Sequence, residues 1–138
     1  MTYKILFVCK HNRFRSKIAS AYFRKINRNK KIIVYDAGII RGIPVARTVI
    51  KICKKFGITL NSNPNPIKEE LLKQIDLVVI VANNVPASIF KGRVEKIIVW
   101  KIPDSRQSDE KKIGRIVKKI MNKVDKLNRK LEKKRWDQ

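Results

Sequence analysis

Residues 5–16 read Ile5-Leu6-Phe7-Val8-Cys9-Lys10-His11-Asn12-Arg13-Phe14-Arg15-Ser16. An apolar run ends in a cysteine, five residues separate that cysteine from an arginine, and a serine follows. The run is typical of a central parallel strand that is covered on both faces. Apolar residues then recur at helical spacing as far as Ile26. The stretch therefore predicts a strand, a short loop and a helix.

The rest of the chain continues this alternation. Strands are expected at 31–35, 77–82 and 94–100, with Asp36-Ala37-Gly38 as a turn. Helices are expected at 44–56, at 67–75, at 86–90 and from Ser108 onward. Gly57 is expected to be the C-cap of the first of these helices, and Asn83-Asn84 to cap the third. Residues 133–138 are expected to fray. The pattern predicts one domain over residues 1–138 with an α/β fold, a three-layer doubly wound four-stranded parallel sheet.

Ligands of such sheets bind at the carboxyl ends of the strands. Cys9 ends the first strand, and Gly38, Asn83 and Asp104 follow the other three. We therefore expect these four residues to gather at one edge of the sheet.

Composition narrows the class of protein. The 138 residues are 43% hydrophobic, which argues against disorder, and no apolar run approaches the length of a membrane span. The chain enters a strand pattern at once, without the layout of a signal peptide. We expect a cytoplasmic protein without a membrane partner. Two cysteines, Cys9 and Cys53, make no disulfide framework, and whether they ever pair stays open.

The charge is extreme. Lysine and arginine number 34 against 11 acidic residues, a net charge of +23, and residues 1–68 contain a single acid, Asp36. A positive potential of this kind concentrates anions. Three interpretations stay open: a solvated lysine-rich surface, attraction of anionic substrates, and weak non-specific nucleic-acid contact. The chain has no recognised nucleic-acid motif and few aromatic residues for base stacking.

The loop after Cys9 has the features of an oxyanion site. A loop that enters a helix N-terminus offers convergent backbone N–H groups to a tetrahedral anion and favours a thiolate. Arg15 can hold two phosphate oxygens, Ser16 can donate to the Cys9 sulfur, and Asn12 can pin the loop through bonds to its backbone. A lone cysteine here would be an inert buried thiol. The combination favours a nucleophile in a phosphate-binding loop.

Cys9 to Ser16 resembles the signature of the low-molecular-weight protein tyrosine phosphatases and of the related thioredoxin-coupled arsenate reductases. The resemblance covers nearly the whole chain, with further landmarks at Asp36-Ala37-Gly38, Gly42-Ile43-Pro44, Phe56-Gly57-Ile58, Asp76 and Trp100 to Asp104. It implies a low-molecular-weight phosphatase-like fold, in agreement with the four-stranded sheet expected above.

The resemblance also implies a mechanism. Cys9 would attack phosphorus and form a phosphocysteine, Arg15 would bind the phosphate, and Asp104 would act as general acid and then as general base. The substrate-binding loop would consist of Lys10, His11, Asn12, Arg13, Phe14 and Ser16. No metal and no cofactor is expected. The substrate would be a phosphorylated protein or a small phosphomonoester, with phosphate, vanadate or arsenate as active-site anions.

Three departures from the family pattern keep alternatives open. His11 stands where the phosphatases have glycine, and a His-Asn pair is closer to the reductases; histidine tolerates positive φ, so we interpret His11 as a residue that shapes the loop. Residues 81–86 lack the reductases' relay cysteines, and Cys53 falls on an apolar stripe, so arsenate reduction would need an external thiol.

The role of Asp104 also has an alternative. Asp104 could be a turn residue that forms a capping box with Gln107.

The third departure concerns the pocket mouth. The tyrosine phosphatases place aromatic residues there, whereas this chain has Ile39-Ile40-Arg41 and Ser105-Arg106, which would make the rim basic. Phosphotyrosine preference therefore stays open, while hydrolysis of a phosphate monoester is the favoured function. The alternatives are arsenate reduction with an external thiol and a non-catalytic protein that binds phosphate or nucleic acid.

Overall fold

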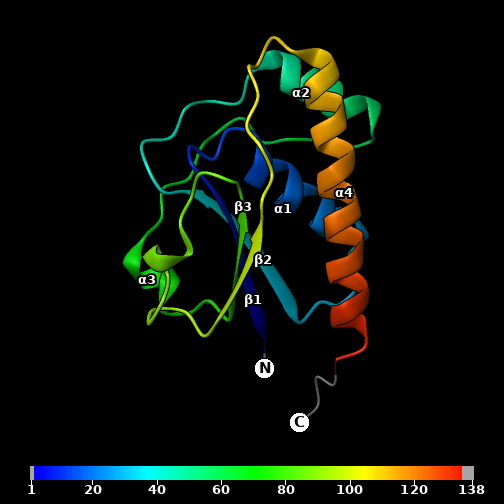
Figure 1. The fold of residues 1–138 in the computed structure, drawn as a ribbon. Helices are drawn as coiled ribbons and strands as arrows, with labels where there is room; N and C mark the ends of the chain where they lie inside the picture. The colour runs from blue at the N-terminus through cyan, green and yellow to red at the C-terminus, as the bar shows by residue number, and fades with distance from the viewer. Residues whose placement is uncertain (1, 135–138) are drawn as a thin grey trace.

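The computed structural model describes residues 2–134, which form a four-stranded parallel sheet with helices on both faces (Figure 1). The sheet has the order β2-β1-β3-β4, with β1 at Tyr3–Cys9, β2 at Ile32–Gly38, β3 at Leu77–Val81 and β4 at Lys96–Trp100. The helices are α1 at Arg15–Ile26, α2 at Arg47–Lys55, α3 at Glu69–Leu72 and α4 at Glu110–Glu132, with a 3₁₀ turn, η1, at Ala87–Ile89. The α/β fold with a four-stranded parallel sheet is as predicted. Most of the predicted frayed end, 133–138, lies outside the described residues.

The central strand β1 is buried on both faces. Ile5 and Phe7 belong to the core between the sheet and the layer of α1, α2 and α4, whereas Leu6 and Val8 belong to the core on the α3 side. All four side chains are fully inaccessible to solvent. The strand that ends in Cys9 is therefore fixed from both sides, which holds the loop after it in place.

The long helix α4 covers one face of the sheet with an apolar stripe and exposes lysine and arginine on its outer side. Its buried residues are Ile113, Ile116, Val117, Ile120, Val124, Leu127, Asn128 and Leu131. Among residues 2–134, no helix has the combination of length and apolarity that a membrane crossing requires.

Several predicted boundaries are wrong, for identifiable reasons. Asp36-Ala37-Gly38 is not a turn but the end of β2, where it pairs with the last three residues of β1. The helix predicted at 67–75 contracts to α3, because Gln74 and Ile75 bond three residues back instead of four. Helix α4 is capped by Asp109, whose carboxylate accepts the backbone N–H of Lys112, and not by Ser108.

One predicted cap is confirmed. Gly57 has a φ of +72°, and the N–H groups of Gly57 and Ile58 bond to the carbonyls of Lys54 and Cys53. This is a Schellman ending, in which glycine adopts the left-handed conformation without strain.

Candidate active site

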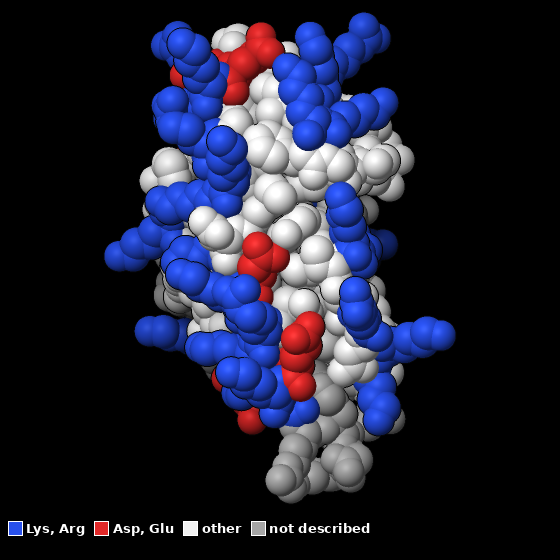
Figure 2. All heavy atoms as spheres, turned by 90° about the vertical axis from the view of Figure 1, so that its right-hand side faces the viewer, with Lys and Arg blue, Asp and Glu red and all other residues white. Residues whose placement is uncertain are grey.

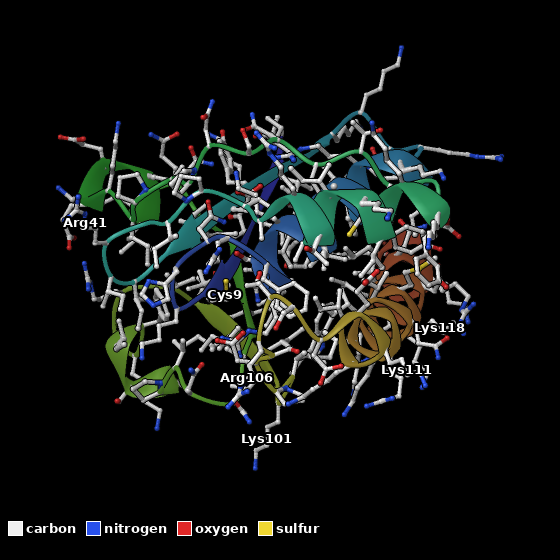
Figure 3. All side chains as sticks on the ribbon, turned by 90° about the horizontal axis from the view of Figure 1, so that it is seen from above. Cys9, Arg41, Lys101, Arg106, Lys111 and Lys118 are labelled. Atoms are coloured by element: carbon white, nitrogen blue, oxygen red, sulfur yellow. The ribbon has the colours of Figure 1, made fainter. Side chains whose placement is uncertain are left out.

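The loop of residues 10–14 joins the carboxyl end of β1 to the N-terminus of α1, and Cys9 lies near the centre of the sheet edge seen from above (Figure 3). Gly38 pairs with Cys9 on the neighbouring strand. A Cβ atom at Gly38 would lie 2.7 Å from the carbonyl carbon of His11 and 2.8 Å from the nitrogen of Asn12. Only glycine allows β2 to support the loop this closely.

The backbone of the loop presents unpaired donors. Among the hydrogen bonds of residues 2–134, none has a backbone N–H of residues 10–14 as its donor. Helix α1 begins immediately afterwards, and its first turn contains no acidic residue. Free N–H groups at a helix N-terminus attract an anion, because the helix dipole places partial positive charge there.

The predicted bond between Cys9 and Ser16 is present. The Sγ atom of Cys9 lies 2.9 Å from the Oγ atom of Ser16, and both residues are buried. The side-chain amide of Asn12 donates to the same Oγ atom over 2.8 Å. Because Ser16 accepts from Asn12, its own proton is available to the sulfur. A hydroxyl aimed in this way stabilises negative charge on sulfur.

The positive φ of the loop falls on Asn12, at +53°, and not on His11, where we expected it. Asparagine tolerates the left-handed region better than most residues do. His11 instead places Nδ1 2.9 Å from the carbonyl oxygen of Arg41. It thereby ties the phosphate-binding loop to the loop after β2, which agrees with a role in loop shape.

Behind the loop lies a buried charge cluster that the sequence did not reveal. Asp36 is 7% exposed and pairs with Lys17 at 3.1 Å and with Arg24 at 3.6 Å. The hydroxyl of Ser20 also donates to it. Lys17 is itself buried, at 3% exposure. It is buried because the only acid among residues 1–68 lies beneath it.

The cluster holds Asn12 in place. The Asn12 amide donates to Asp36 over 2.9 Å, and its side-chain oxygen accepts the backbone N–H of Asn65. We expected Asn12 to bond within its own loop, but it bonds to Ser16, β2 and the segment before α3. Asp36 is therefore a positioning residue, because it fixes the side chain that sets the curvature of the loop.

The ionisation of Asp36 reflects opposing effects. Burial raises the pKa of its carboxyl group. The hydrogen bond from Ser20, the charge of Lys17 and the hydrogen bond from Asn12 outweigh burial and hold the pKa below its usual value. Asp36 is therefore charged at neutral pH and stabilises the fold in that form.

Asp36→Asn should lower the free energy of unfolding by about 3 kcal/mol at neutral pH, because Lys17 keeps a buried charge without its partner. Urea denaturation measures this loss. Because folding lowers the pKa of Asp36, its contribution is present above the pKa of the unfolded state and disappears as the pH falls through the folded value. The difference between the two proteins should therefore shrink below about pH 4. A difference that is constant down to pH 2 would contradict this account.

Asp125→Asn is the matched control. Asp125 accepts a single hydrogen bond from Tyr22 at a partly exposed position. Its loss should cost about 1 kcal/mol or less, because solvent screens the group and replaces the bond.

Arg15 reaches across the sheet edge from α1. It is 2% exposed, and its two terminal nitrogens donate to the carbonyl of Ile102 over 2.9 Å and to the side-chain oxygen of Asn84 over 3.1 Å. Its Nε atom is buried and has no partner. Asn84 was expected to cap η1, but Pro86 occupies the cap position and Asn84 orients Arg15 instead. A buried guanidinium with one donor unused has room for an anion.

Asp104 joins the site from the loop after β4. Its carboxylate lies 3.6 Å from Arg15, its side chain is 48% exposed, and it accepts the backbone N–H of Ser105. The capping box with Gln107 is absent, because α4 begins only at Glu110 and Gln107 donates to the carbonyl of Ser105. The backbone N–H of Asn83 donates to the carbonyl of Ile102, which also accepts from Arg15. The expected gathering of Cys9, Gly38, Asn83 and Asp104 at one edge is confirmed.

The remaining loop residues differ in what they offer. Phe14 is 1% exposed and packs in the core, so only its backbone faces a ligand. Lys10 and Arg13 are half-buried, and the Nε atom of Arg13 is buried without a partner.

The second cysteine, Cys53, lies in the core, where burial raises the pKa of its thiol to about 12. Cys53 is therefore an unreactive thiol at neutral pH.

Four residues of the site were missed from the sequence: Lys17, Asp36, Asn65 and Asn84. One signal was available for Asp36, because a lone acid in a strongly basic half is expected to have several basic partners. Nothing in the sequence marked the two asparagines, since their bonds to Asn12 and Arg15 span 53 and 69 positions.

Comparisons with known proteins find the same fold. An arsenate reductase from Archaeoglobus fulgidus is 26% identical, with a TM-score of 0.72 over 90% of this chain and 98% of that one. A protein tyrosine phosphatase from Entamoeba histolytica is 25% identical, with a TM-score of 0.78 over 95% and 97%. The YwlE arginine phosphatase from Geobacillus stearothermophilus is 19% identical, with a TM-score of 0.80 over 94% and 93%, and shows the fold alone.

No curated protein matches the sequence closely enough to count as a relative. The family model described as low molecular weight phosphotyrosine protein phosphatase matches residues 4–136. That range contains the phosphate-binding loop, Arg15 and the loop with Asp104. The chain therefore belongs to the low molecular weight phosphotyrosine protein phosphatase family of cysteine phosphatases.

Proposed function

We propose that this protein hydrolyses phosphate monoesters through a phosphocysteine on Cys9. The observation that carries the proposal is the set of unused donors in the segment that follows Cys9: the backbone N–H groups of residues 10–14 and the buried Nε atom of Arg15. Together they match the equatorial oxygens of a phosphoryl group in transfer, where catalysis depends on positioning and on charge stabilisation.

The reaction has two steps. The Cys9 sulfur attacks phosphorus, the S–P bond forms, and the bond to the leaving oxygen breaks while Asp104 gives that oxygen a proton. Asp104, now a carboxylate, takes a proton from water. The water oxygen attacks phosphorus, the S–P bond breaks, and phosphate leaves with Cys9 restored as thiolate. Ser16 stabilises the sulfur as leaving group in this second step.

The direct test is hydrolysis of p-nitrophenyl phosphate without added metal. Release of p-nitrophenol and phosphate in equal amounts is the expected result. A protein that binds phosphate or vanadate but releases no product would be the non-catalytic alternative, and the proposal would then be wrong.

Asp104→Asn should lower kcat by about 10²- to 10³-fold for an alkyl or unsubstituted phenyl phosphate, the range of general acid catalysis. The loss should be smaller for p-nitrophenyl phosphate, because its leaving group needs no proton. Vanadate affinity should change little, since the side chain of Asp104 is half-exposed and solvent screens its charge. Steady-state kinetics with both substrates measure the difference.

Asp109→Asn is the matched control, because Asp109 lies on the same loop and caps α4. It should affect stability rather than kcat. An equal loss of kcat for both substrates in Asp104→Asn would contradict a proton-donor role.

Phosphotyrosine is the substrate that the family description and the Entamoeba histolytica protein favour. Peptides that contain phosphotyrosine, phosphoserine or phosphoarginine test this directly. The highest kcat/KM is expected for phosphotyrosine, and a higher value for phosphoarginine would move the chain toward the activity named for the YwlE relative.

Arsenate reduction is the second candidate, supported by the His11-Asn12 pair and by the Archaeoglobus fulgidus relative. The Cys9 sulfur would bond to arsenic, and an external thiol would then attack that sulfur, release arsenite and leave a mixed disulfide. The two electrons that reduce arsenic come from the Cys9 sulfur and the external thiol, which form the disulfide, and a second external thiol then reduces that disulfide and restores Cys9. Cys53 does not replace the external thiol, because it is buried and protonated. Arsenate-dependent oxidation of thioredoxin or glutathione would show this activity, and no turnover with either would exclude it.

A further inference from the structure

Cations surround the mouth of the site. The loops that follow β1, β2 and β4 contain five of them: Lys10, Arg13, Arg41, Lys101 and Arg106. We call these five residues the basic rim. The same three loops contain two acids, Asp104 and Asp109, of which Asp104 faces Arg15 and Asp109 caps α4. Seen from above, Arg41 lies on one side of Cys9, and Arg106 and Lys101 lie on the other (Figure 3).

The basic rim has no acidic partner of its own. Among residues 2–134, the ion pairs join Arg15 to Asp104, Lys17 and Arg24 to Asp36, and Arg93 to Glu69, so no rim residue takes part in one. Arg41, Lys101 and Arg106 are exposed. Their charges are thus available to a ligand that reaches beyond the phosphate.

The mouth offers little to an aromatic ring. The loops 39–46 and 101–109 contain no aromatic residue, and Phe14 of the phosphate-binding loop is buried in the core. The exposed side chains of Ile40 and Ile43 are the apolar contribution on the β2 side. The substrate's surroundings must therefore be recognised mainly through charge.

We propose that the basic rim selects phosphorylated protein segments that have carboxylates on both sides of the phosphorylated residue. The inference rests on the proposed function and names its substrate class. With the phosphate above Cys9, an extended segment leaves the site in two directions, one toward Arg41 and the other toward Arg106 and Lys101. Charge complementarity of this kind raises the rate of encounter and fixes the register of the segment.

An acidic protein segment fits these observations better than nucleic acid does. Nucleic-acid phosphates are diesters, which the two-step reaction does not cleave, and the exposed aromatic residues that stack bases are missing from these loops. Basic side chains also gather on the face of the molecule that carries α4, in two bands on either side of a pale strip that contains a few acidic side chains (Figure 2). That charge contributes to the long-range potential, but Lys118 projects away from Cys9 (Figure 3).

The test uses four tyrosine phosphopeptides that differ only at the two positions on each side of the phosphotyrosine. One has glutamate on both sides, one only before it, one only after it, and one has glutamine throughout. The fully acidic peptide should have a kcat/KM about tenfold above that of the glutamine peptide at low salt, and the ratio should fall as salt screens the charges.

Single substitutions in the basic rim show which rim residue recognises each side of the phosphotyrosine. An ion pair between an exposed rim residue and a peptide carboxylate is weak. Arg41→Gln should therefore lower the kcat/KM of one singly acidic peptide, relative to the glutamine peptide, by about two- to fivefold, and should leave the ratio for the other singly acidic peptide unchanged. Arg106→Gln should do the converse. The control is the double variant Lys118→Gln/Lys126→Gln, which removes two exposed charges from α4 and should leave all four ratios unchanged.

The outcomes separate the inference from the function on which it rests. No hydrolysis of p-nitrophenyl phosphate would mean that the proposed function fails. Hydrolysis of p-nitrophenyl phosphate with equal kcat/KM for all peptides, or with none of the peptides hydrolysed, would overturn the inference alone. Equal losses in the rim and α4 variants would also overturn it, as would stronger inhibition by a single-stranded oligonucleotide than by a polyglutamate peptide of equal charge.

Discussion

Replacing Cys9 with serine is expected to abolish phosphatase activity, lowering kcat for p-nitrophenyl phosphate by on the order of 10⁴-fold or more, as the loss of a covalent nucleophile does. A hydroxyl is a far weaker nucleophile than a thiolate. Serine is also a poor leaving group in the second step. Because serine is almost isosteric with cysteine and keeps a polar group against Ser16, the protein should remain folded, and its thermal unfolding should show this.

Cys53→Ala is the control for this variant. Cys53 lies in the core between α2 and the sheet, and its thiol is protonated at neutral pH. Its removal should cost some stability through the cavity it leaves, but kcat per folded molecule should not change. Full activity after Cys9→Ser, or loss of activity after Cys53→Ala without unfolding, would contradict the assignment of the nucleophile.

Arg15→Lys is expected to have the second-largest effect. Lysine keeps the positive charge but loses the fork that bonds to Ile102 and Asn84, and it has no counterpart of the unused Nε donor. We expect kcat/KM to fall by about 10²- to 10³-fold, the loss typical of a donor that stabilises transition-state charge. Vanadate, which mimics the transferred group, should bind more weakly by a similar factor.

Arg24→Lys is matched to this change, because Arg24 lies on the same helix and bonds to the carbonyl of Val34 and to Asp36. The lysine of this variant would keep a positive charge next to Asp36 and would not contact the phosphoryl group. The effect of Arg24→Lys on kcat/KM should be about threefold or less, since the side chain of Arg24 is half-exposed. Equal losses in the two variants would mean that Arg15 supports the fold and does not bind the phosphoryl group.

The fold was largely predictable because its signals are local. The apolar runs at residues 5–9 of β1 and 77–81 of β3 are buried, and the stripe of α4 has the spacing of one helical face. The errors fell where distant partners decide the outcome. Asp36 and Gly38 favour a turn by residue type, but pairing with β1 keeps them in β2. The end of the helix predicted at 67–75 is lost near the start of β1, where the side chain of Lys4 donates to Gln74 and the backbone N–H of Asp76 donates to the carbonyl of Lys4.

The site was predictable to the extent that it lies in one stretch of sequence. Cys9, Ser16 and Arg15 take their relation from a strand, a loop and a helix that are consecutive, and the Cys9–Ser16 bond is confirmed. The support of the loop was not predictable. The left-handed residue is Asn12 and not His11, and the atoms that hold it come from β2 and from the segment before α3.

Trapping the covalent intermediate tests the central claim most directly. Wild-type protein is mixed with p-nitrophenyl phosphate, the reaction is stopped in acid within milliseconds, and the digested protein is analysed by mass spectrometry. The account predicts a burst of one p-nitrophenol per site and a phosphoryl group on the peptide that contains Cys9, with more of it in Asp104→Asn, where breakdown is slow. Turnover without a burst and without phosphate on Cys9, or with phosphate on another residue, would contradict it.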